Sequence, residues 1–381
     1  MIIGVPKEIK QQEFRVGIVP AGVHALTKKG HKVIIQKFAG EGSGIHDGEY
    51  VSAGAIIRET SKEIYEEADM IMKIKEPLPE EFGLLKPGQI LYTYLHLAPN
   101  KELTLALLER KIIGIAYETV QLTDGSLPLL IPMSEIAGRM AIQVGASLLE
   151  KGKGGRGVLL AGVPGVAPGN VVILGAGTVG INAAKIAMGM GAKVTIFDVN
   201  IERLRYLDDI FGARIITLFP DQHTIEKSVT EADLVVGAVL IPGARAPILV
   251  DRSLVSRMKT GAVIVDVAVD QGGCVETIHP TSHENPTYVV DNVIHYGVAN
   301  MPGAVARTST FALTNVTLPY SLKIASMCIP IALKEDPALL AGLNLYKGNL
   351  VCKPVGDCLK IPYATPESLF SLKEESIRTS R

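Results

Sequence analysis

Four polar side chains in the first third of the chain stand where apolar runs end. Arg15 lies in the loop after the first apolar run, and Lys75, His96 and Glu118 each close or follow a later run. Ligands of open parallel sheets bind outside the carboxyl ends of the strands, so we expect these residues at one edge of a sheet. An arginine and a lysine can hold a carboxylate while an imidazole transfers protons. Taken singly, Lys75 and Glu118 also fit surface charges, and His96 fits an ordinary loop histidine.

A glycine-rich sequence, Gly175-Ala-Gly177-Thr-Val-Gly180, follows an apolar run at 171–174 and begins a helical pattern at 178–190. In this context G-x-G-x-x-G is the fingerprint of a dinucleotide-binding turn. Gly175 permits the tight turn, Gly177 lets backbone N–H groups approach a pyrophosphate, and Gly180 lets helix and strand pack closely. The helix N-terminus adds unpaired donors and a positive dipole end. A glycine-rich turn without a ligand is the alternative.

The next expected strand, 193–197, is followed by Asp198. A carboxylate at this position accepts hydrogen bonds from ribose hydroxyls and repels a 2′-phosphate, so the sequence favours NAD over NADP. Arg203 and Arg205 lie just beyond and are able to recruit that phosphate instead. Their plain alternative is a pair of solvated charges in the first turn of a helix.

Asp266 and Asp270 bracket the end of another expected strand, 262–267. If a dinucleotide crosses the strand ends, Asp270 lies near its nicotinamide half. The competing interpretation is a structural carboxylate that caps the following turn, and the sequence Gln271-Gly-Gly is compatible with such a turn.

Short apolar runs alternate with helical patterns in two blocks, which predicts an α/β architecture with parallel sheets. Strands are expected at 2–5, 32–36, 70–74, 90–95, 112–117, 171–174, 193–197, 234–238, 262–267 and 288–290. Helices are expected at 21–29, 101–110, 136–149, 178–190 and 308–327. The helix at 178–190 is expected to bury a face formed by Val179, Ala183, Ile186, Ala187 and Met190. A flexible loop is expected at 151–157 and a disordered, charged tail at 373–381.

The composition fits a protein of two ordinary domains with little net charge. The 381 residues suffice for two cores, and a net charge of −1 gives no sign of nucleic acid or an anionic membrane as a partner. We expect no signal peptide, and no apolar run reaches the roughly 20 residues that cross a bilayer. The four cysteines lack metal-ligand spacing, so we expect no metal and reduced thiols in a cytoplasmic protein. A mean hydropathy of +0.28 fits either apolar surface buried between subunits or a large core.

Seven segments form a recognisable set along the chain. They are Gly4-Val-Pro-Lys-Glu, Arg15-Val-Gly-Ile-Val-Pro, Tyr92-Thr-Tyr-Leu-His-Leu-Ala-Pro, Pro132-Met-Ser-Glu-Ile-Ala-Gly-Arg, Gly162-Val-Pro-Gly-Val-Ala-Pro, Val265-Asp-Val-Ala-Val-Asp-Gln-Gly-Gly and His295-Tyr-Gly-Val-Ala-Asn-Met-Pro-Gly-Ala-Val. Together they resemble the bacterial L-alanine dehydrogenase family. The likeness extends in order to beyond Pro319 and weakens after about Pro366.

The resemblance implies two doubly wound domains. A Rossmann NAD-binding domain at 129–306 would be inserted into a flavodoxin/Rossmann-like catalytic domain formed by 1–128 and 307–381, and the assembly would be a homohexamer. Arg15 and Lys75 would bind the substrate carboxylate and carbonyl, with His96 and Asp270 as the acid/base pair. The family's nucleotide contacts would fall on Ser134, Gly175, Gly177, Thr178, Val179, Gly180, Asp198, Arg203, Val239, Leu240, Val267, Asp270, Asn300 and Met301. Family members often carry a serine near the adenosine where this chain has Pro220.

The activity implied by the resemblance is the reversible, NAD-dependent oxidative deamination of L-alanine to pyruvate and ammonia, a reaction of alanine catabolism. The nucleotide-binding subunit of proton-translocating transhydrogenase is similar along the same length and is the main alternative, and saccharopine dehydrogenase is a more distant relative. Tyr94-Leu-His96 and Met133-Ser134 resemble the alanine enzyme, because transhydrogenase subunits usually lack this histidine. Retention of all four polar site candidates argues against a non-catalytic NAD-sensing module.

Overall fold

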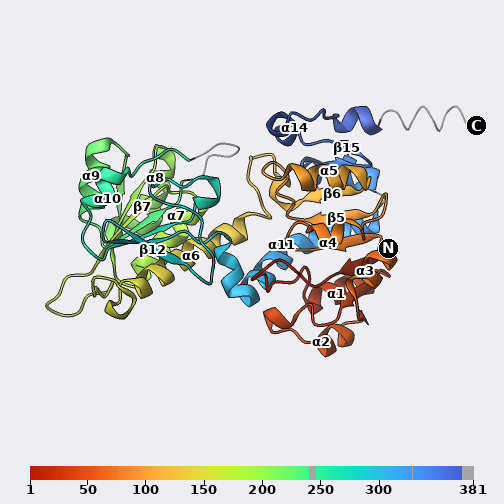
Figure 1. Cartoon of the computed structure of the whole chain (residues 1–381), viewed down its shortest axis with the longest axis horizontal. Helices are drawn as coiled ribbons and strands as arrows, with labels where there is room; N and C mark the ends of the chain where they lie inside the picture. Colours follow the sequence, from red (N-terminus) through yellow and green to blue (C-terminus); the bar gives the residue numbers. More distant parts are fainter. Residues whose placement is uncertain (240–245, 328, 371–381) are drawn as a thin grey trace, which may run out of the picture. The chain divides into compact units, whose positions relative to one another are not determined.

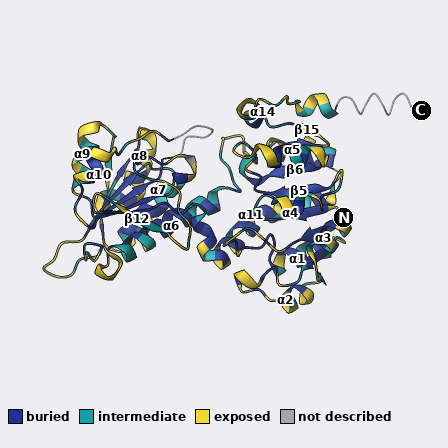
Figure 2. Ribbon diagram, in the orientation of Figure 1, coloured by how far each residue is buried: buried dark blue, intermediate teal, exposed yellow. Residues whose placement is uncertain are grey.

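The computed structural model describes residues 1–239, 246–327 and 329–370. Within them the chain forms two compact units (Figure 1). The first consists of Met1–Pro132 and the chain from Val305 onward, and the second of Met133–Ala304. In each unit the central strands are buried and the outer helix faces are exposed (Figure 2). The predicted Leu240 contact and the predicted tail at 373–381 lie outside the described residues.

An eight-stranded sheet forms the centre of the first unit. From edge to edge its strands are β15 (Asn349–Leu350), β14 (Leu343–Tyr346), β6 (Ile113–Ala116), β5 (Ile90–Thr93), β4 (Met70–Met72), β1 (Ile2–Val5), β2 (Lys32–Gln36) and β3 (Ile56–Arg58). Strands β1 to β6 are parallel, and β14 and β15 are antiparallel additions beyond β6. The order 3-2-1-4-5-6 is that of a doubly wound sheet, and it reverses between β1 and β4.

Helices cover both faces of this sheet. They are α1 (Pro20–Lys28), α2 (Asp47–Ser52), α3 (Ser61–Glu67), α4 (Pro79–Phe82), α5 (Lys101–Glu109), α11 (Ala306–Ser326), α12 (Ile329–Glu335), α13 (Pro337–Ala341) and α14 (Lys353–Leu359), with short 3-10 helices η1 (Glu41–Ser43) and η2 (Tyr117–Thr119). Buried side chains of α3, α5 and α14 pack together on the strands, as Ile64, Leu107 and Val355 illustrate. Helix α11 packs against α1 and η1, and its Thr317 carbonyl accepts a 3.3 Å hydrogen bond from Tyr92 of β5.

The second unit has a seven-stranded sheet in which the first five strands of the unit follow the same order, 3-2-1-4-5. Its strands are β12 (Thr287–Val290), β13 (Val293–Tyr296), β11 (Val263–Asp266), β10 (Leu234–Gly237), β7 (Asn170–Leu174), β8 (Lys193–Phe197) and β9 (Ile216–Leu218). All pairs are parallel except β12 with β13. The order reverses between β7 and β10, so the ends of these two strands form the switch point where such sheets bind ligands.

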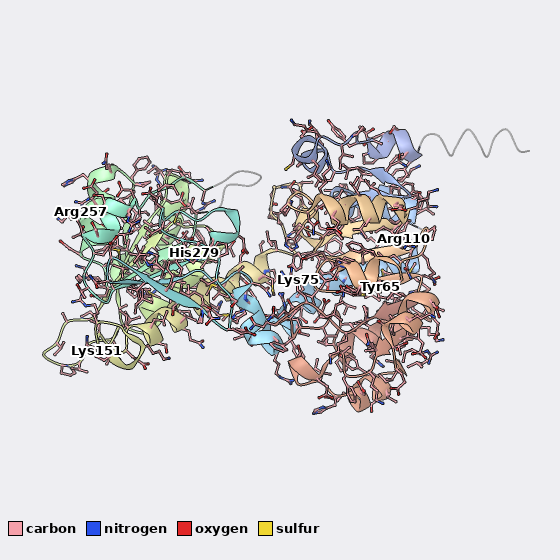
Figure 3. All side chains as sticks on the ribbon, in the orientation of Figure 1. Tyr65, Lys75, Arg110, Lys151, Arg257 and His279 are labelled. Carbon is pink, nitrogen blue, oxygen red and sulfur yellow. The ribbon has the colours of Figure 1, made fainter. Side chains whose placement is uncertain are left out.

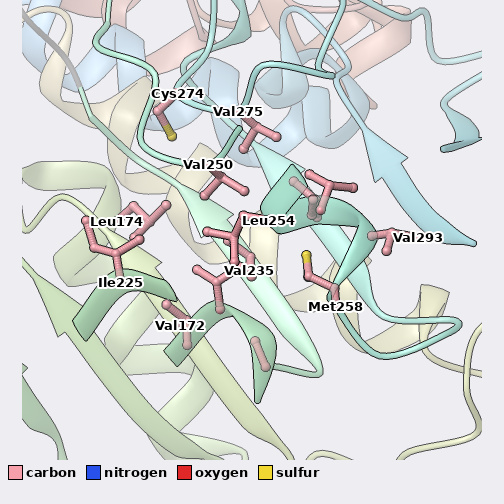
Figure 4. Packing of buried hydrophobic residues seen from close by; sticks show 14 of the residues in the cluster. Val172, Leu174, Ile225, Val235, Val250, Leu254, Met258, Cys274, Val275 and Val293 are labelled. Atoms are coloured by element: carbon pink, nitrogen blue, oxygen red, sulfur yellow. The ribbon is translucent and has the colours of Figure 1, made fainter. Parts of the chain in front are cut away.

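One face of the second sheet carries a tightly packed apolar cluster (Figure 4). Strand residues Val172 and Val235 contact side chains of α9 and α10, among them Ile225 and Leu254. The helices and 3-10 helices of this part of the chain are α6 (Ile131–Leu148), η3 (Lys151–Lys153), α7 (Thr178–Gly189), α8 (Ile201–Phe211), η4 (Gly212–Arg214), α9 (Gln222–Thr230), α10 (Arg252–Ser256), η5 (Val269–Gln271) and η6 (Met301–Val305). Side-chain caps begin several of them: Asn200 accepts the Arg203 N–H, and Asp221 accepts the Thr224 N–H.

Several predicted elements differ from the structure in extent. The strand expected at 112–117 ends at Ala116, because Tyr117 already begins η2, and the helix expected from 136 begins at Ile131, with Pro132 tolerated in its first turn. The buried face predicted for α7 is wrong at Met190, which is 38% exposed. Ala183 and Ala187 are buried as predicted, and Gly180, Asn182 and Ala184 are buried beside them, because the helix lies close against the sheet. Among the described residues, no helix is long and apolar enough to cross a membrane.

Candidate active site

The four polar candidates of the first unit lie at the carboxyl ends of adjacent parallel strands. Arg15 follows β1, Lys75 follows β4, His96 follows β5 and Glu118 follows β6. Figure 3 shows Lys75 at the carboxyl-terminal ends of the strands and Arg110, which precedes β6, at their amino-terminal ends. Since β1 and β4 flank the reversal of strand order, Arg15 and Lys75 stand at the switch point of the sheet.

Arg15 is buried and bound to a carboxylate that the sequence reasoning missed. Its Nε lies 2.6 Å from Glu13 Oε1 and its Nη2 lies 2.5 Å from Glu13 Oε2. The exposed fractions of the two side chains are 2% and 0%. Burial opposes ionisation of Glu13, but the Arg15 hydrogen bonds and charge leave its pKa below the usual range. The charge of Arg15 is thus balanced within the protein itself.

Lys75 is half-buried and held through its backbone. The Glu8 carboxylate accepts the Ile74 N–H at 2.6 Å and the Lys75 N–H at 3.4 Å, and Thr93 Oγ1 donates to the Lys75 carbonyl at 3.1 Å. Burial, and then the positive charge of Arg15, lower the pKa of the Lys75 ammonium. The surface-charge alternative for Lys75 therefore does not describe its surroundings.

Two carboxylates face the segment that carries His96. Glu118 accepts the backbone N–H groups of Leu95 at 3.1 Å and His96 at 2.7 Å, so it is not merely a surface charge. These bonds hold His96 at a φ of 48°, in the left-handed region that non-glycine residues rarely adopt. Glu76, directly after Lys75, places Oε2 3.3 Å from His96 Nδ1. The imidazole itself remains 43% exposed.

The glycine-rich loop of the second unit has the geometry of an anion-binding turn. Gly175 has a φ of +100°, and a Cβ on Gly180 would lie 1.8 Å from the Gly175 carbonyl oxygen. A Cβ on Gly177 would meet no heavy atom within 4 Å, so that side of the loop is open. Gly177 is the N-cap of α7, and no side chain caps the helix. The residues present thus fit the pyrophosphate of a dinucleotide.

Asp198 connects this loop to the end of β8. Its carboxylate accepts the backbone N–H groups of Ala176 and Asn200, each at 2.8 Å, and lies 3.0 Å from Arg203 Nη1. Arg205, the other cation considered for a 2′-phosphate, pairs with Glu202. Both arginines are therefore matched to carboxylates of their own helix or loop.

The two aspartates at the turn after β11 have different surroundings. Asp266 is 1% exposed and accepts the backbone N–H groups of Ala268 at 2.9 Å, Cys274 at 2.8 Å and Val275 at 3.3 Å. Burial raises the pKa of Asp266, and these donors oppose the rise. Asp266 thus caps this turn, and Asp270 is exposed in η5.

The other predicted nucleotide contacts are spread over the second unit. Ser134 lies half-buried in the first turn of α6, Thr178 and Val179 open α7, and Val239 and Val267 follow β10 and β11. Asn300 has a φ of 64°, and its carbonyl lies 3.2 Å from His283 Nε2. Met301 is buried at the start of η6, and Pro220 follows β9.

Comparison with known proteins matches nearly the whole chain to one family. Residues 4–137 match the alanine dehydrogenase/PNT N-terminal domain, and residues 141–353 match its C-terminal domain. The alanine dehydrogenase of Methanococcus maripaludis is 62% identical over 372 residues, covering 97% of this chain and 100% of that protein. The alanine dehydrogenase of Geobacillus stearothermophilus is 55% identical, with coverages of 97% and 100%.

Solved structures agree with this assignment. An L-alanine dehydrogenase structure that is 56% identical superposes with a TM-score of 0.93 and covers 94% of this chain and 99% of that one. The transhydrogenase structure from Sinorhizobium meliloti has a TM-score of 0.81 but only 24% identity, covering 92% of this chain and 100% of that one, so it supports the fold alone. The chain belongs to the alanine dehydrogenase/PNT family.

Proposed function

We propose that this chain is an NAD-dependent L-alanine dehydrogenase that reversibly converts L-alanine to pyruvate and ammonia. The observation that carries the proposal is the gathering of Arg15, Lys75 and His96 at the carboxyl edge of one sheet, next to its switch point. Two cations and an exposed imidazole are what a small 2-amino or 2-oxo acid requires. The high identity to proteins named alanine dehydrogenase supports the choice of substrate.

The proposed roles follow from the chemistry of these side chains. Lys75 and Arg15 bind the substrate carboxylate and, in the amination direction, the carbonyl of pyruvate. A bound nicotinamide supplies the acceptor for the hydride of the alanine Cα–H bond, which leaves the imine of pyruvate. His96 and Asp270 take up and return protons as water adds to the imine and ammonia leaves.

NAD is the proposed cofactor rather than NADP. The Gly175–Gly180 loop would hold the pyrophosphate, and Asp198 would accept the ribose hydroxyls and repel a 2′-phosphate. We expect a much higher kcat/KM with NAD than with NADP. The variant Asp198→Asn keeps the size of the side chain but removes the repelling charge and releases Arg203, so it should narrow that difference. Equal kcat/KM for both cofactors in the parent protein would contradict this role of Asp198.

A direct assay distinguishes the enzyme from a transhydrogenase subunit. The purified protein, without membranes or partners, should form NADH from NAD when L-alanine is added, and alanine from pyruvate, ammonia and NADH. A panel of other amino acids defines the substrate range. If the protein only exchanges hydride between two nucleotides in the presence of a partner subunit, the transhydrogenase alternative is correct. A cytoplasmic homohexamer of 40.7 kDa chains completes the proposal and rests on the family resemblance.

A further inference from the structure

We propose that Glu76 is a positioning residue for His96: its carboxylate faces Nδ1 of the imidazole and thereby directs Nε2 toward the substrate. This inference rests on the proposed function of His96 as the acid/base group. Glu76 Oε2 lies 3.3 Å from His96 Nδ1, and the exposed fractions of the two side chains are 12% and 43%. The pair thus has a buried anionic side and an accessible imidazole side.

Glu76 Oε2 is otherwise unused. It is buried, and no hydrogen bond of good geometry reaches it from the described residues, although His96 Nδ1 is within ion-pair distance. The second oxygen, Oε1, contacts the Lys10 ammonium. Burial disfavours the ionised carboxyl, yet His96 and Lys10 together lower the pKa of Glu76 to about 2. The Glu76 carboxylate is therefore charged at the pH values at which a dehydrogenase works. One of its oxygens contacts Lys10 and the other faces His96.

A carboxylate at Nδ1 fixes the chemistry of the other ring nitrogen. Because the bond made by one nitrogen decides which tautomer is present, Glu76 favours the proton on Nδ1 and leaves Nε2 as the basic atom. When Nε2 takes a proton, the same carboxylate stabilises the imidazolium. This arrangement repeats the logic of a carboxylate that orients a catalytic histidine. The 3.3 Å contact is long, and such catalytic contacts often shorten when substrate binds.

The backbone of His96 is held independently of this contact. Glu118 accepts the N–H groups of Leu95 and His96, so removing Glu76 leaves the loop attached to η2. The neighbouring Tyr94 ring lies 5.7 Å from the imidazole, and burial raises the pKa of Tyr94, which is therefore neutral at working pH. Lys75 interacts electrostatically with Glu76, and Lys10 contacts it directly. Glu76 and Glu118 thus bring negative charge to the His96 segment, and Lys10 and Lys75 interact with Glu76.

The test measures protonation of His96 without requiring turnover. Diethyl pyrocarbonate acylates neutral imidazole, and peptide mass spectrometry of the intact protein labelled at a series of pH values gives a midpoint for each histidine. In Glu76→Gln the labelling midpoint of His96 should lie below that of the parent protein, because a negative charge 3.3 Å from Nδ1 is lost. In Glu76→Asp, which keeps the charge, it should stay close to the parent value.

A second histidine–carboxylate pair provides a matched control. His46 Nδ1 lies 3.0 Å from both oxygens of Glu41 at an exposed site, and this carboxylate raises the pKa of His46. Glu41→Gln should lower the labelling midpoint of His46 and leave that of His96 unchanged. Glu76→Gln should do the reverse.

Kinetics then connect the contact to catalysis. Deamination needs neutral His96 and amination needs its protonated form, so in Glu76→Gln the acid limb of deamination and the alkaline limb of amination should both move to lower pH. Turnover should fall roughly tenfold or more. An unchanged His96 midpoint in Glu76→Gln overturns the inference whatever the activity, and a shifted midpoint with unmoved limbs overturns it as well. A parent protein without alanine activity would refute the proposed function separately, because the labelling test needs no substrate.

Discussion

Arg15 enters the proposed chemistry already paired with a carboxylate. A substrate carboxylate would therefore share the guanidinium with Glu13, whereas Lys75 has no such direct partner among the described contacts of its side chain. The two cations thus differ in what their removal leaves behind. Loss of Arg15 leaves the buried Glu13 carboxylate without its cation. Loss of Lys75 removes a positive charge that repels Arg15.

We therefore predict different consequences for Lys75→Ala and Arg15→Ala. Both should weaken pyruvate binding, since a lost charge-assisted hydrogen bond costs about 1.5–3 kcal/mol, roughly tenfold to more than a hundredfold in affinity. Only Arg15→Ala should also destabilise the protein strongly, by about 3–5 kcal/mol, because it breaks a buried ion pair. Titration of NADH fluorescence with pyruvate measures the first effect and thermal melting the second. Unchanged pyruvate affinity in both variants would mean that the carboxylate site is elsewhere.

At this scale the sequence could indicate the cations and the imidazole but not their partners. Arg15, Lys75 and His96 stand out because they follow apolar runs. Glu13 and Glu76 stand beside them in the chain, yet many charged residues do, and only the folded loops show that these two carboxylates turn toward Arg15 and His96. A side chain that acts through another residue leaves no spacing signal of its own.

At the scale of elements, the turn after β11 carries two aspartates, Asp266 and Asp270, for which we expect a structural and a chemical role respectively. We predict that Asp270→Asn keeps the melting temperature while turnover falls roughly a hundredfold or more, the usual share of acid–base catalysis. Asp266→Asn should show the opposite pattern. Its amide would meet backbone donors now bound by the carboxylate, at a cost of about 1.5–3 kcal/mol in stability. Near-parental turnover in Asp270→Asn would remove this residue from the mechanism.

The elements that could be predicted are those with long apolar runs. Strands β1, β2 and β8 have the predicted bounds because each is a continuous apolar or alternating run between polar turns. The short strands β3 and β9, the parallel strand β13 and the antiparallel additions β14 and β15 were not predicted. Their pairing depends on partners far away in the sequence, as β14 shows by lying beside β6. The buried face of α7 was misjudged for a related reason, because close packing on a sheet selects small side chains over large ones.

At the scale of the whole molecule, charge is nearly balanced, with 38 basic and 39 acidic residues. Lowering the pH therefore changes the stability of the fold mainly through individual carboxylates whose pKa differs between the folded and unfolded states. Glu13 and Glu76 have lowered values, so each contributes stability that is present above its unfolded pKa and lost as pH falls toward the folded one. Glu8 acts in the opposite sense, because burial raises its pKa despite the attraction of Lys73.

Glu76 allows this argument to be tested, because its pKa falls from 4.5 to about 2. That shift corresponds to at most about 3.5 kcal/mol of stability above pH 4.5, which disappears between roughly pH 4.5 and pH 2. We predict that Glu76→Gln melts at a lower temperature than the parent at pH 7 and that the difference shrinks steadily toward pH 2. Calorimetry across this range measures it, with Glu41→Gln as the control for an exposed pair. A difference in melting temperature that stays constant with pH would show that Glu76 stabilises the fold through packing rather than through its charge.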